Sequence, residues 1–364
     1  MPKLIDSLPK PPWRQGSFRL RRLPIMLAVS SIFAMVLFYV LISMSPCMVG
    51  SQRCYKGYTS AYSFDAYHAH HPRWMTAIPD DVNLTSLSIP GTHDTMTYGM
   101  PENEHLQCQI WNLATQLNAG LRYFDIRARL QDDELKIYHS SGFTGFGYTD
   151  VLVAMFDFLD ENPGETIIMR LKEEGVPIGD HNTISFEDAL VKHHESSPIT
   201  SPGASKHLYH YNQTDPLPNL GALRSRIFLL QNFDSKDQQT SPYGLIWEGP
   251  QMALEDLWII PDIHHLVDKW NAIRSALEAA ARAPLNNTLL YLAHISASVG
   301  VLPIEAAAGP KNKAVVGMND LTGQWLRDFS AHRDASARTG VVIIDFPGKK
   351  LIDAVLRWNE PLTK

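Results

Sequence analysis

The chain has 364 residues, of which 45% are hydrophobic and 19% charged, and these values are ordinary for a folded domain and too apolar for a disordered chain. The net charge is -6 although residues 1–22 carry six Lys or Arg and one Asp, so the rest of the chain is more acidic than the whole. This acidic body argues against nucleic acid as a partner, because duplex binding depends on neutralising phosphates with Lys and Arg.

An uncharged segment follows the basic residues. No charged residue lies between Leu23 and Gln52, and residues 25–44 are nearly all apolar. About 20 such residues suffice to cross a bilayer as a helix, and the arginines at 19, 21 and 22 favour a cytosolic N-terminus. The alternative is a cleaved signal peptide, but the apolar stretch exceeds the usual ~7–15 residues and no A-x-A site follows it.

These features predict a single-pass membrane protein. We expect a cytosolic basic tail over residues 1–22, an uncleaved transmembrane signal anchor over residues 23–45 and a juxtamembrane linker over residues 46–72. Residues 73–364 would then form a domain in the lumen of the secretory pathway or outside the cell. Cys47 and Cys54 are near enough in sequence to pair in an oxidising compartment, and Asn83, Asn212 and Asn286 begin sequons typical of a glycoprotein.

Short apolar runs alternate with helical stretches beyond residue 73. The expected strands are Leu84–Ile89, Leu121–Ala128, Thr166–Lys172, Arg226–Asn232, Thr288–Ser296 and Val341–Phe346. The expected helices are Ile110–Ala119, Asp150–Asp160 and Leu266–Arg282. Strands that alternate with helices pair in parallel through crossovers, and fully apolar runs fit strands buried on both faces. The pattern predicts an α/β fold, a TIM-type barrel, with residues 175–219 as an insertion or lid.

Polar residues stand where the expected strands end, which is where parallel barrels carry their functional side chains. Within residues 123–127, period two puts Asp125 and Arg127 on one face. Singly, a His is more often a hydrogen-bonded structural residue, and an Asp after a strand is often a helix cap. Two histidines with several carboxylates and an arginine at one edge of the barrel indicate acid–base chemistry instead. The residues are His93, Asp94, Asp125, Arg127, His139, Lys172 and Asp345.

The segment Ser88–Asp94 (SIPGTHD) resembles the first signature of the catalytic X domain of phosphatidylinositol-specific phospholipases C. Gly120–Arg127 (GLRYFDIR) resembles the second signature, with His139 following at the expected interval. Glu165–Lys172 resembles the third, and Val342–Asp345 the closing strand. The resemblance spans roughly residues 73–360 and is to the metal-independent bacterial- and fungal-type branch, which folds as an irregular (β/α) barrel.

The resemblance also implies that no metal and no other cofactor takes part. Calcium-dependent relatives have Asn after the first His and a Glu-x-Asp pair on the second strand, where this chain has Asp94 and Asp125-Ile126-Arg127. Calcium takes about six or more oxygen ligands. The guanidinium of Arg127 would repel the ion and supply its positive charge.

The activity implied by the resemblance is that of a phosphoric diester lyase, which cleaves an inositol phospholipid in a membrane to diacylglycerol and a cyclic inositol phosphate. His93 would be the general base, oriented by Asp345, because its ordinary pKa suits a base at neutral pH. His139 would be the general acid, supported by Asp94, and Arg127 would hold a phosphate oxygen.

The resemblance assigns substrate binding to Lys172, Asp256 and Trp258, together with Asp125. Trp258 stands where the family has Tyr, and an arginine that the family carries near the end of Arg226–Asn232 is missing. These departures leave open a glycosylated inositol lipid or another head group as the substrate, and a catalytically silent lipid-binding barrel is the remaining alternative. His294 ends an expected strand and is interpreted as structural.

Overall fold

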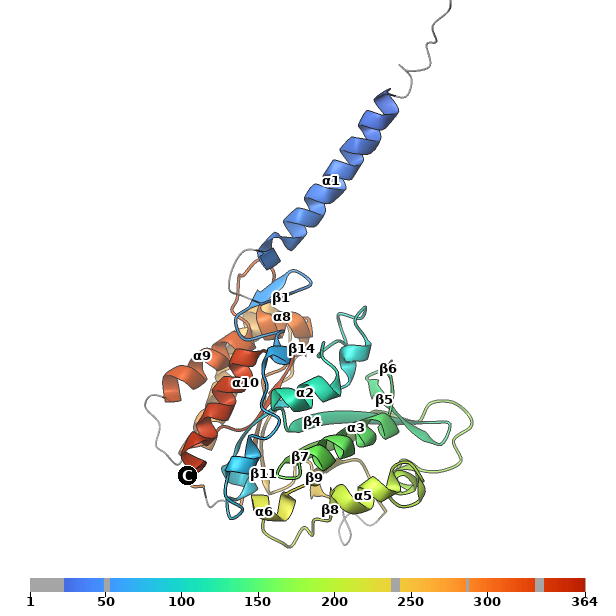
Figure 1. Cartoon of the computed structure of the whole chain (residues 1–364), viewed down its shortest axis with the longest axis vertical. Helices are drawn as coiled ribbons and strands as arrows, with labels where there is room; N and C mark the ends of the chain where they lie inside the picture. Colours follow the sequence, from blue (N-terminus) through green and yellow to red (C-terminus); the bar gives the residue numbers. More distant parts are fainter. Residues whose placement is uncertain (1–22, 49–52, 237–242, 286–287, 331–336, 364) are drawn as a thin grey trace, which may run out of the picture. The chain divides into compact units, whose positions relative to one another are not determined.

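The computed structural model describes residues 23–48, 53–236, 243–285, 288–330 and 337–363 (Figure 1). The chain divides into two compact units, Met1–Gly50 and Ser51–Lys364. Each unit is described by itself.

The first unit contains α1 (Leu23–Met48), whose described side chains, from Ile25 to Leu41, are exposed. Within the described residues, no helix combines the length and apolar character needed to cross a bilayer. This finding overturns the expectation of a single-pass membrane protein with a cytosolic N-terminus and a lumenal or extracellular domain. The expected basic tail, residues 1–22, lies outside the described residues.

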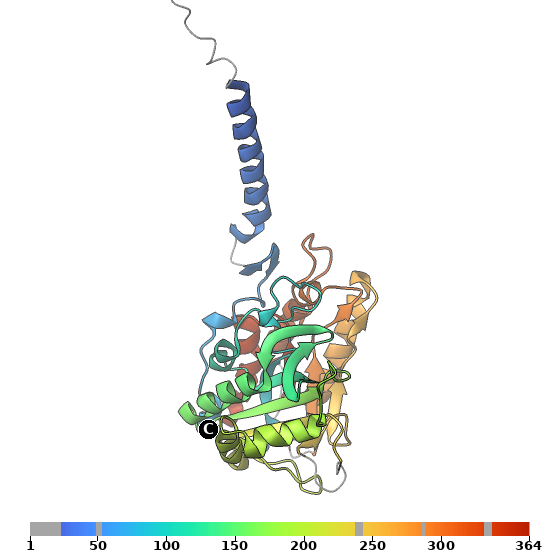
Figure 2. The same ribbon diagram turned by 90° about the vertical axis from the view of Figure 1, so that its right-hand side faces the viewer.

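The second unit is an α/β fold built on a curled parallel sheet (Figure 2). Its strands, in sheet order, are β10 (Leu245–Ile246), β9 (Arg226–Asn232), β7 (Thr166–Glu173), β4 (Tyr123–Gln131), β3 (Ser88–Thr92), β15 (Gly340–Ile344), β13 (Leu290–His294) and β11 (Met252–Glu255). Every neighbouring pair on this path is parallel. Among the described residues no pairing joins β10 to β11, so the sheet is a half-barrel that is open between its two end strands.

Shorter strands extend or flank this sheet. β5 (Glu134–His139) continues β4 as an antiparallel hairpin and pairs with β6 (Gly142–Gly147), while β8 (Leu208–Tyr209) pairs with β9. Two small sheets complete the set: β1 (Arg53–Tyr55) with β2 (Tyr58–Ser60), and β12 (Ile259–Ile260) with β14 (Ser298–Val299).

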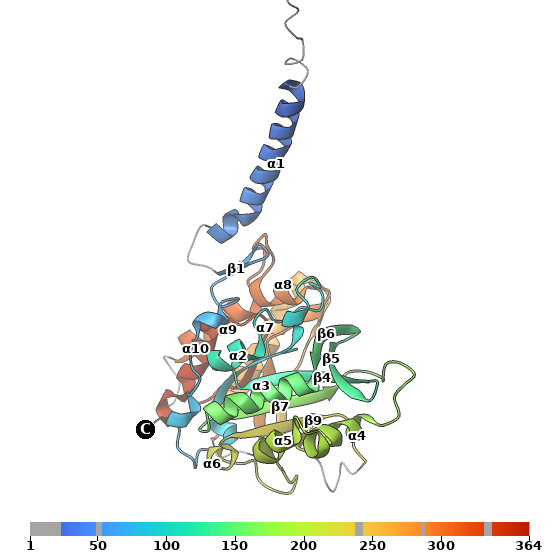
Figure 3. The same ribbon diagram turned by 45° about the vertical axis from the view of Figure 1, so that its right-hand side comes forward.

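Helices cover the outer face of the sheet (Figures 1 and 3). α2 (Leu113–Ala119), α3 (Tyr148–Glu161), α4 (Phe186–Val191) and α5 (Ser201–His207) share one apolar cluster with β4, β7 and β9. α7 (Leu266–Arg282), α9 (Met318–Ser330) and α10 (Lys349–Leu356) share another with β13 and β15. The remaining helices are α6 (Leu220–Leu223), α8 (Pro303–Ala308), the 3-10 turns η1 (Ala66–His68), η2 (Met75–Ala77), η3 (Leu84–Ser86), η4 (Thr97–Gly99), η6 (Ile263–His265) and η7 (Arg357–Leu362), and the π-helical turn η5 (Lys192–Ser196).

The strands alternate between an inner and an outer core, and this alternation positions the polar residues. On β4, Tyr123 packs in the cluster inside the curled sheet, whereas Phe124 and Ile126 pack outward against the helices. Because successive strand side chains point to opposite faces, Asp125 and Arg127 share the inner side with Tyr123. The apolar interior therefore gives way to a polar layer at the carboxyl ends of the strands.

Residues 53–72, expected as a linker, belong to the second unit. Tyr58 and Phe64 are buried in a cluster with Phe346, and Ala66 is buried in the cluster that contains α2. The unit therefore begins before residue 73, the position at which we expected the domain to begin. The contacts responsible join residues far apart in sequence, so local composition gave no sign of them.

The first expected strand, Leu84–Ile89, is displaced. Leu84–Ser86 form the turn η3, because the Asn83 side chain accepts a hydrogen bond from Thr85 N, and the strand begins at Ser88. The Asn83 amide nitrogen also donates to Leu217 O at 2.8 Å, so this sequon nitrogen is engaged within the fold. Asn286 and the side chain of Cys47 lie outside the described residues, and with them the predicted Cys47–Cys54 pairing.

Candidate active site

The strands β15, β3, β4 and β7 are neighbours in the sheet, and their carboxyl ends bring the predicted residues together. His93 and Asp94 follow β3 directly, and Asp345 follows β15. These residues lie at one end of the half-barrel, as the sequence predicts. The other residues of the set are Asp125 and Arg127 in β4, His139 at the end of β5, and Lys172 in β7.

His93 is held on both sides of its ring. Its Nδ1 lies 2.9 Å from Asp345 Oδ1, and its Nε2 lies 3.0 Å from Asp94 Oδ2 and 2.8 Å from Arg127 Nη2. Burial alone lowers the pKa of His93, but the charges of Asp94 and Asp345 raise it, and the net pKa lies well above the usual value. The ring is thus fixed and has a strengthened basicity, which suits a general base.

Asp94 joins the two histidines. Its Oδ2 lies 3.0 Å from His93 Nε2 and 3.2 Å from His139 Nε2, and its Oδ1 lies 3.0 Å from Arg127 Nε. Burial alone raises the pKa of Asp94, but the charges of Arg127 and the two histidines lower it by more. The net pKa lies below the usual value, so the carboxyl stays ionised. Asp94 has a positive φ of 41°, an uncommon conformation for a residue other than glycine, and such strain is concentrated at functional sites.

His139 faces His93 across Asp94. Its Nδ1 lies 2.7 Å from Leu106 O, which fixes a proton on that nitrogen, and its Nε2 points to Asp94. The ring centroids of the two histidines are 6.2 Å apart. Both rings also line one cavity, in which one histidine can accept a proton from a bound molecule and the other can donate one.

Arg127 is fixed by carboxylates. Its Nε and Nη2 donate to Asp125 Oδ2 at 3.0 and 2.9 Å, and Glu174 Oε1 lies 3.9 Å from Nη1. Burial lowers the pKa of Arg127, but Asp125, Asp94 and Glu174 raise it well above the usual value. The guanidinium is therefore a permanent cation, with an orientation set by the fold.

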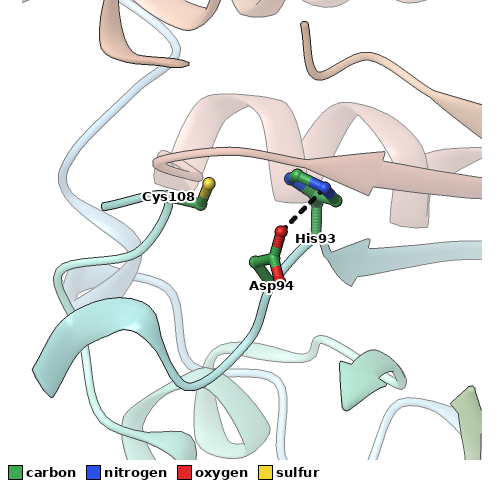
Figure 4. A group of neighbouring side chains, drawn as sticks. All are labelled: His93, Asp94 and Cys108. Carbon is green, nitrogen blue, oxygen red and sulfur yellow. Dashed lines mark ion pairs between the residues drawn. The ribbon is translucent and has the colours of Figure 1, made fainter. Parts of the chain in front are cut away.

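The described residues contain one group of potential metal ligands, formed by His93, Asp94 and Cys108, whose ligand atoms lie within 4.8 Å of one another (Figure 4). Burial raises the pKa of Cys108, which keeps it a neutral thiol, a poor ligand. Arg127 lies within 3.0 Å of both His93 and Asp94. A cation bound there would be repelled by the guanidinium, so these residues do not fit a metal.

A cavity of about 620 Å³ opens beside this group. Of the predicted residues, those that line it are His93, Arg127, His139, Lys172, Asp256 and Trp258. Asp94, Asp125 and Asp345 are buried behind them and are not among the lining residues. Lys172 Nζ lies 2.7 Å from Glu174 Oε2, and the Trp258 side chain in the cavity wall is 47% exposed.

Several further lining residues were not assigned from the sequence, among them Arg170, Glu174, Asn232 and Trp247. Only Arg170 had a local signal, because period two places it on the face of β7 that carries Lys172. His294 is also close, since its ring centroid is 5.6 Å from that of His93. Burial lowers the pKa of His294 to about 3, so it is neutral, and it does not line the cavity.

Comparison with known proteins agrees with this geometry. Residues 84–232 match the family Phosphatidylinositol-specific phospholipase C, X domain. The 1-phosphatidylinositol phosphodiesterase of Listeria monocytogenes is 31% identical over 300 residues, covering 79% of this chain and 85% of the relative. The enzyme of the same name from Staphylococcus aureus is 22% identical over 307 residues, covering 80% and 93%.

Solved structures give the same result. The phosphatidylinositol-specific phospholipase C of Listeria monocytogenes superimposes with a TM-score of 0.63 at 30% identity, covering 80% of this chain and all of the other. The Staphylococcus aureus enzyme superimposes with a TM-score of 0.62 at 19% identity, over 78% of this chain and 97% of the other, which shows the common fold. The chain belongs to the phosphatidylinositol-specific phospholipase C X-domain family.

Proposed function

We propose that this protein is a phosphoric diester lyase that cleaves an inositol phospholipid to diacylglycerol and a cyclic inositol phosphate. The observation that carries the proposal is the arrangement of His93 and His139 on either side of Asp94, with Arg127 between the carboxylates. A binding protein has no need of an acid and a base held in this way. The names of the relatives support the choice of lipid.

In the proposed reaction, the 2-hydroxyl of the inositol ring attacks the adjacent phosphorus. His93 Nε2 takes the hydroxyl proton, and Asp345 stabilises the imidazolium that results, as in a catalytic triad. A bond forms between the 2-oxygen and phosphorus, and the bond between phosphorus and the glycerol oxygen breaks. His139 gives its proton to the departing glycerol oxygen.

Arg127 holds a non-bridging phosphate oxygen while charge develops on it. Such preorganised charge stabilisation is usually the largest catalytic contribution. Because the guanidinium occupies the place where a cation would act, we propose that the reaction needs no metal. Asp125 then acts by orienting Arg127, and Lys172, Asp256 and Trp258 bind the head group.

The test is to incubate the full chain with phosphatidylinositol vesicles, with and without EDTA, and to follow the product by phosphorus NMR. We expect a cyclic inositol phosphate in both conditions and none with His93→Ala. Loss of activity in EDTA would contradict the metal-independent mechanism, and unchanged activity of His93→Ala would contradict the acid–base assignment. Parallel vesicles with a glycosylated inositol lipid and with sphingomyelin distinguish the alternative head groups, and no product from any of them would favour the lipid-binding alternative.

A further inference from the structure

Arg170 is a cationic residue of the cavity wall that the proposed reaction does not use. It lies in β7, is 5% exposed and lines the cavity. Its Nε and Nη2 donate to Asn232 Oδ1 at 3.0 and 2.6 Å. The ring of Trp247 covers one face of the guanidinium, with its centroid 3.9 Å from Cζ. Asn232 and Trp247 together fix the plane of the guanidinium.

The N–H groups on Nη1 of this guanidinium make no hydrogen bond to the described residues. Its nearest carboxylate oxygen is Asp125 Oδ1, at 3.5 Å, which is beyond the range of a good hydrogen bond. Among the described residues, Asp125 Oδ1 has no hydrogen-bond partner, and Nη1 has none. Arginine carries five N–H donors, and the bonds to Asn232 leave those on Nη1 for a molecule in the cavity.

The charges of the wall indicate what that molecule is. Arg127 and Lys172 each lie within 3.0 Å of a carboxylate, and Glu174, Glu248 and Asp256 also line the cavity. The wall therefore has as many carboxylates as it has Lys and Arg side chains. A further phosphate would meet these carboxylates, whereas hydroxyl groups can accept from the guanidinium and donate to the acids. The balance favours a neutral polyol.

We propose that Arg170 is a specificity residue that donates from Nη1 to hydroxyl oxygens of an unphosphorylated inositol ring. Asn232, at the end of β9, holds Arg170 in place. The identity of the ring rests on the proposed function. The contact itself rests on the cavity and on the unused donors.

The test uses the full chain and the variants Arg170→Gln and Arg170→Lys. The control is Arg226→Gln, at the opposite end of β9 from Asn232 and outside the cavity. The dissociation constant of myo-inositol is measured by calorimetry, and KM and kcat with phosphatidylinositol vesicles. We expect both Arg170 variants to raise the dissociation constant and KM by about tenfold or more and to change kcat little, because a hydrogen bond to a charged group is lost. The control should match the wild type.

The outcomes separate this inference from the proposed function. Unchanged myo-inositol affinity in a folded Arg170→Gln, or failure of the wild type to bind myo-inositol, would overturn the inference, as would a loss of kcat with KM unchanged. Arg170-dependent binding of myo-inositol without cleavage of the lipid would support the inference and overturn the proposed function. Thermal melting shows whether the Gln variant folds. If it does not fold, the Lys variant tests the inference, because lysine keeps the positive charge and lacks the forked N–H donors of arginine.

Discussion

The Oδ1 atom of Asp345 lies 2.9 Å from Nδ1 of His93, on the side of the ring opposite Arg127. This contact joins the end of β15 to the end of β3 and leaves Nε2 of His93 on the side of Arg127 and Asp94. With Asp94, the carboxylate raises the pKa of His93 against the effect of burial. A base with a raised pKa loses activity as the pH falls through that value, so the acidic limb of the kcat/KM profile should lie above the usual pKa of histidine.

Asp345→Asn removes one of the charges that raise the pKa of His93. We therefore expect the acidic limb of the kcat/KM profile to move to lower pH, and kcat to fall about 10²–10⁴-fold because the reactive tautomer is no longer held. The measurement is the pH dependence of phosphatidylinositol cleavage. Asp353→Asn is the matched control, since Asp353 Oδ1 lies 2.7 Å from His71 Nε2 away from the cavity. An acidic limb that stays in place or moves upward would contradict the assignment.

His139→Ala tests the general acid. We expect cleavage of phosphatidylinositol to fall about 10²–10⁴-fold, because the glycerol alkoxide leaves unprotonated. An inositol phosphodiester with a p-nitrophenol leaving group needs no acid, so its cleavage by this variant should be affected much less. His93→Ala should lose both activities. Equal losses on the two substrates by His139→Ala would show that His139 has another role.

Arg127→Lys keeps the positive charge and loses the forked donors. We expect kcat to fall about 10²–10³-fold, as on removal of one preorganised donor. The two diastereomers of a phosphorothioate substrate should also react at more similar rates, because the enzyme would distinguish the two non-bridging positions less well. Arg129→Lys on the same strand is the control, since Arg129 donates to Val176 O and does not line the cavity. An unchanged diastereomer ratio would mean that Arg127 does not contact the phosphate.

Glu165→Gln tests how much a buried ion pair next to the start of β7 contributes to the stability of the fold. Glu165 and Arg122 are fully buried, and Oε2 of Glu165 accepts from Nε and Nη2 of Arg122 at 3.1 and 2.9 Å. Because the substitution leaves a buried guanidinium without its counter-charge, we expect the free energy of unfolding to fall by about 3–5 kcal/mol. Urea denaturation measures it, and Glu278→Gln, in a partly exposed pair with Arg274, should cost under about 1 kcal/mol. Equal effects would contradict the argument.

Much of the architecture follows from local periodicity. The bounds expected for Arg226–Asn232 and Leu266–Arg282 match β9 and α7. Period two places Asp125 and Arg127 on the inner face of β4, because successive strand side chains alternate regardless of what surrounds them. The parallel order of the strands then places the residues that follow them at one end, which is why His93, Asp94 and Asp345 were found from the sequence.

The other features of the site were decided by the tertiary structure. They depend on distances between segments far apart in the sequence, and a local sequence pattern contains no information on these distances. No sequence pattern shows that Asp94 lies within 3.2 Å of both histidines, since His139 reaches it through the hairpin of β5 and β6. The packing of residues 53–72 against the rest of the second unit likewise depends on contacts such as Phe64 with Phe346. The role inferred for Arg170 depends on Asn232 and Trp247, which only the neighbouring strands bring to it. The sequence by itself predicted which residues would carry the chemistry, and the fold decided which of them touch the cavity and which hold the others in place.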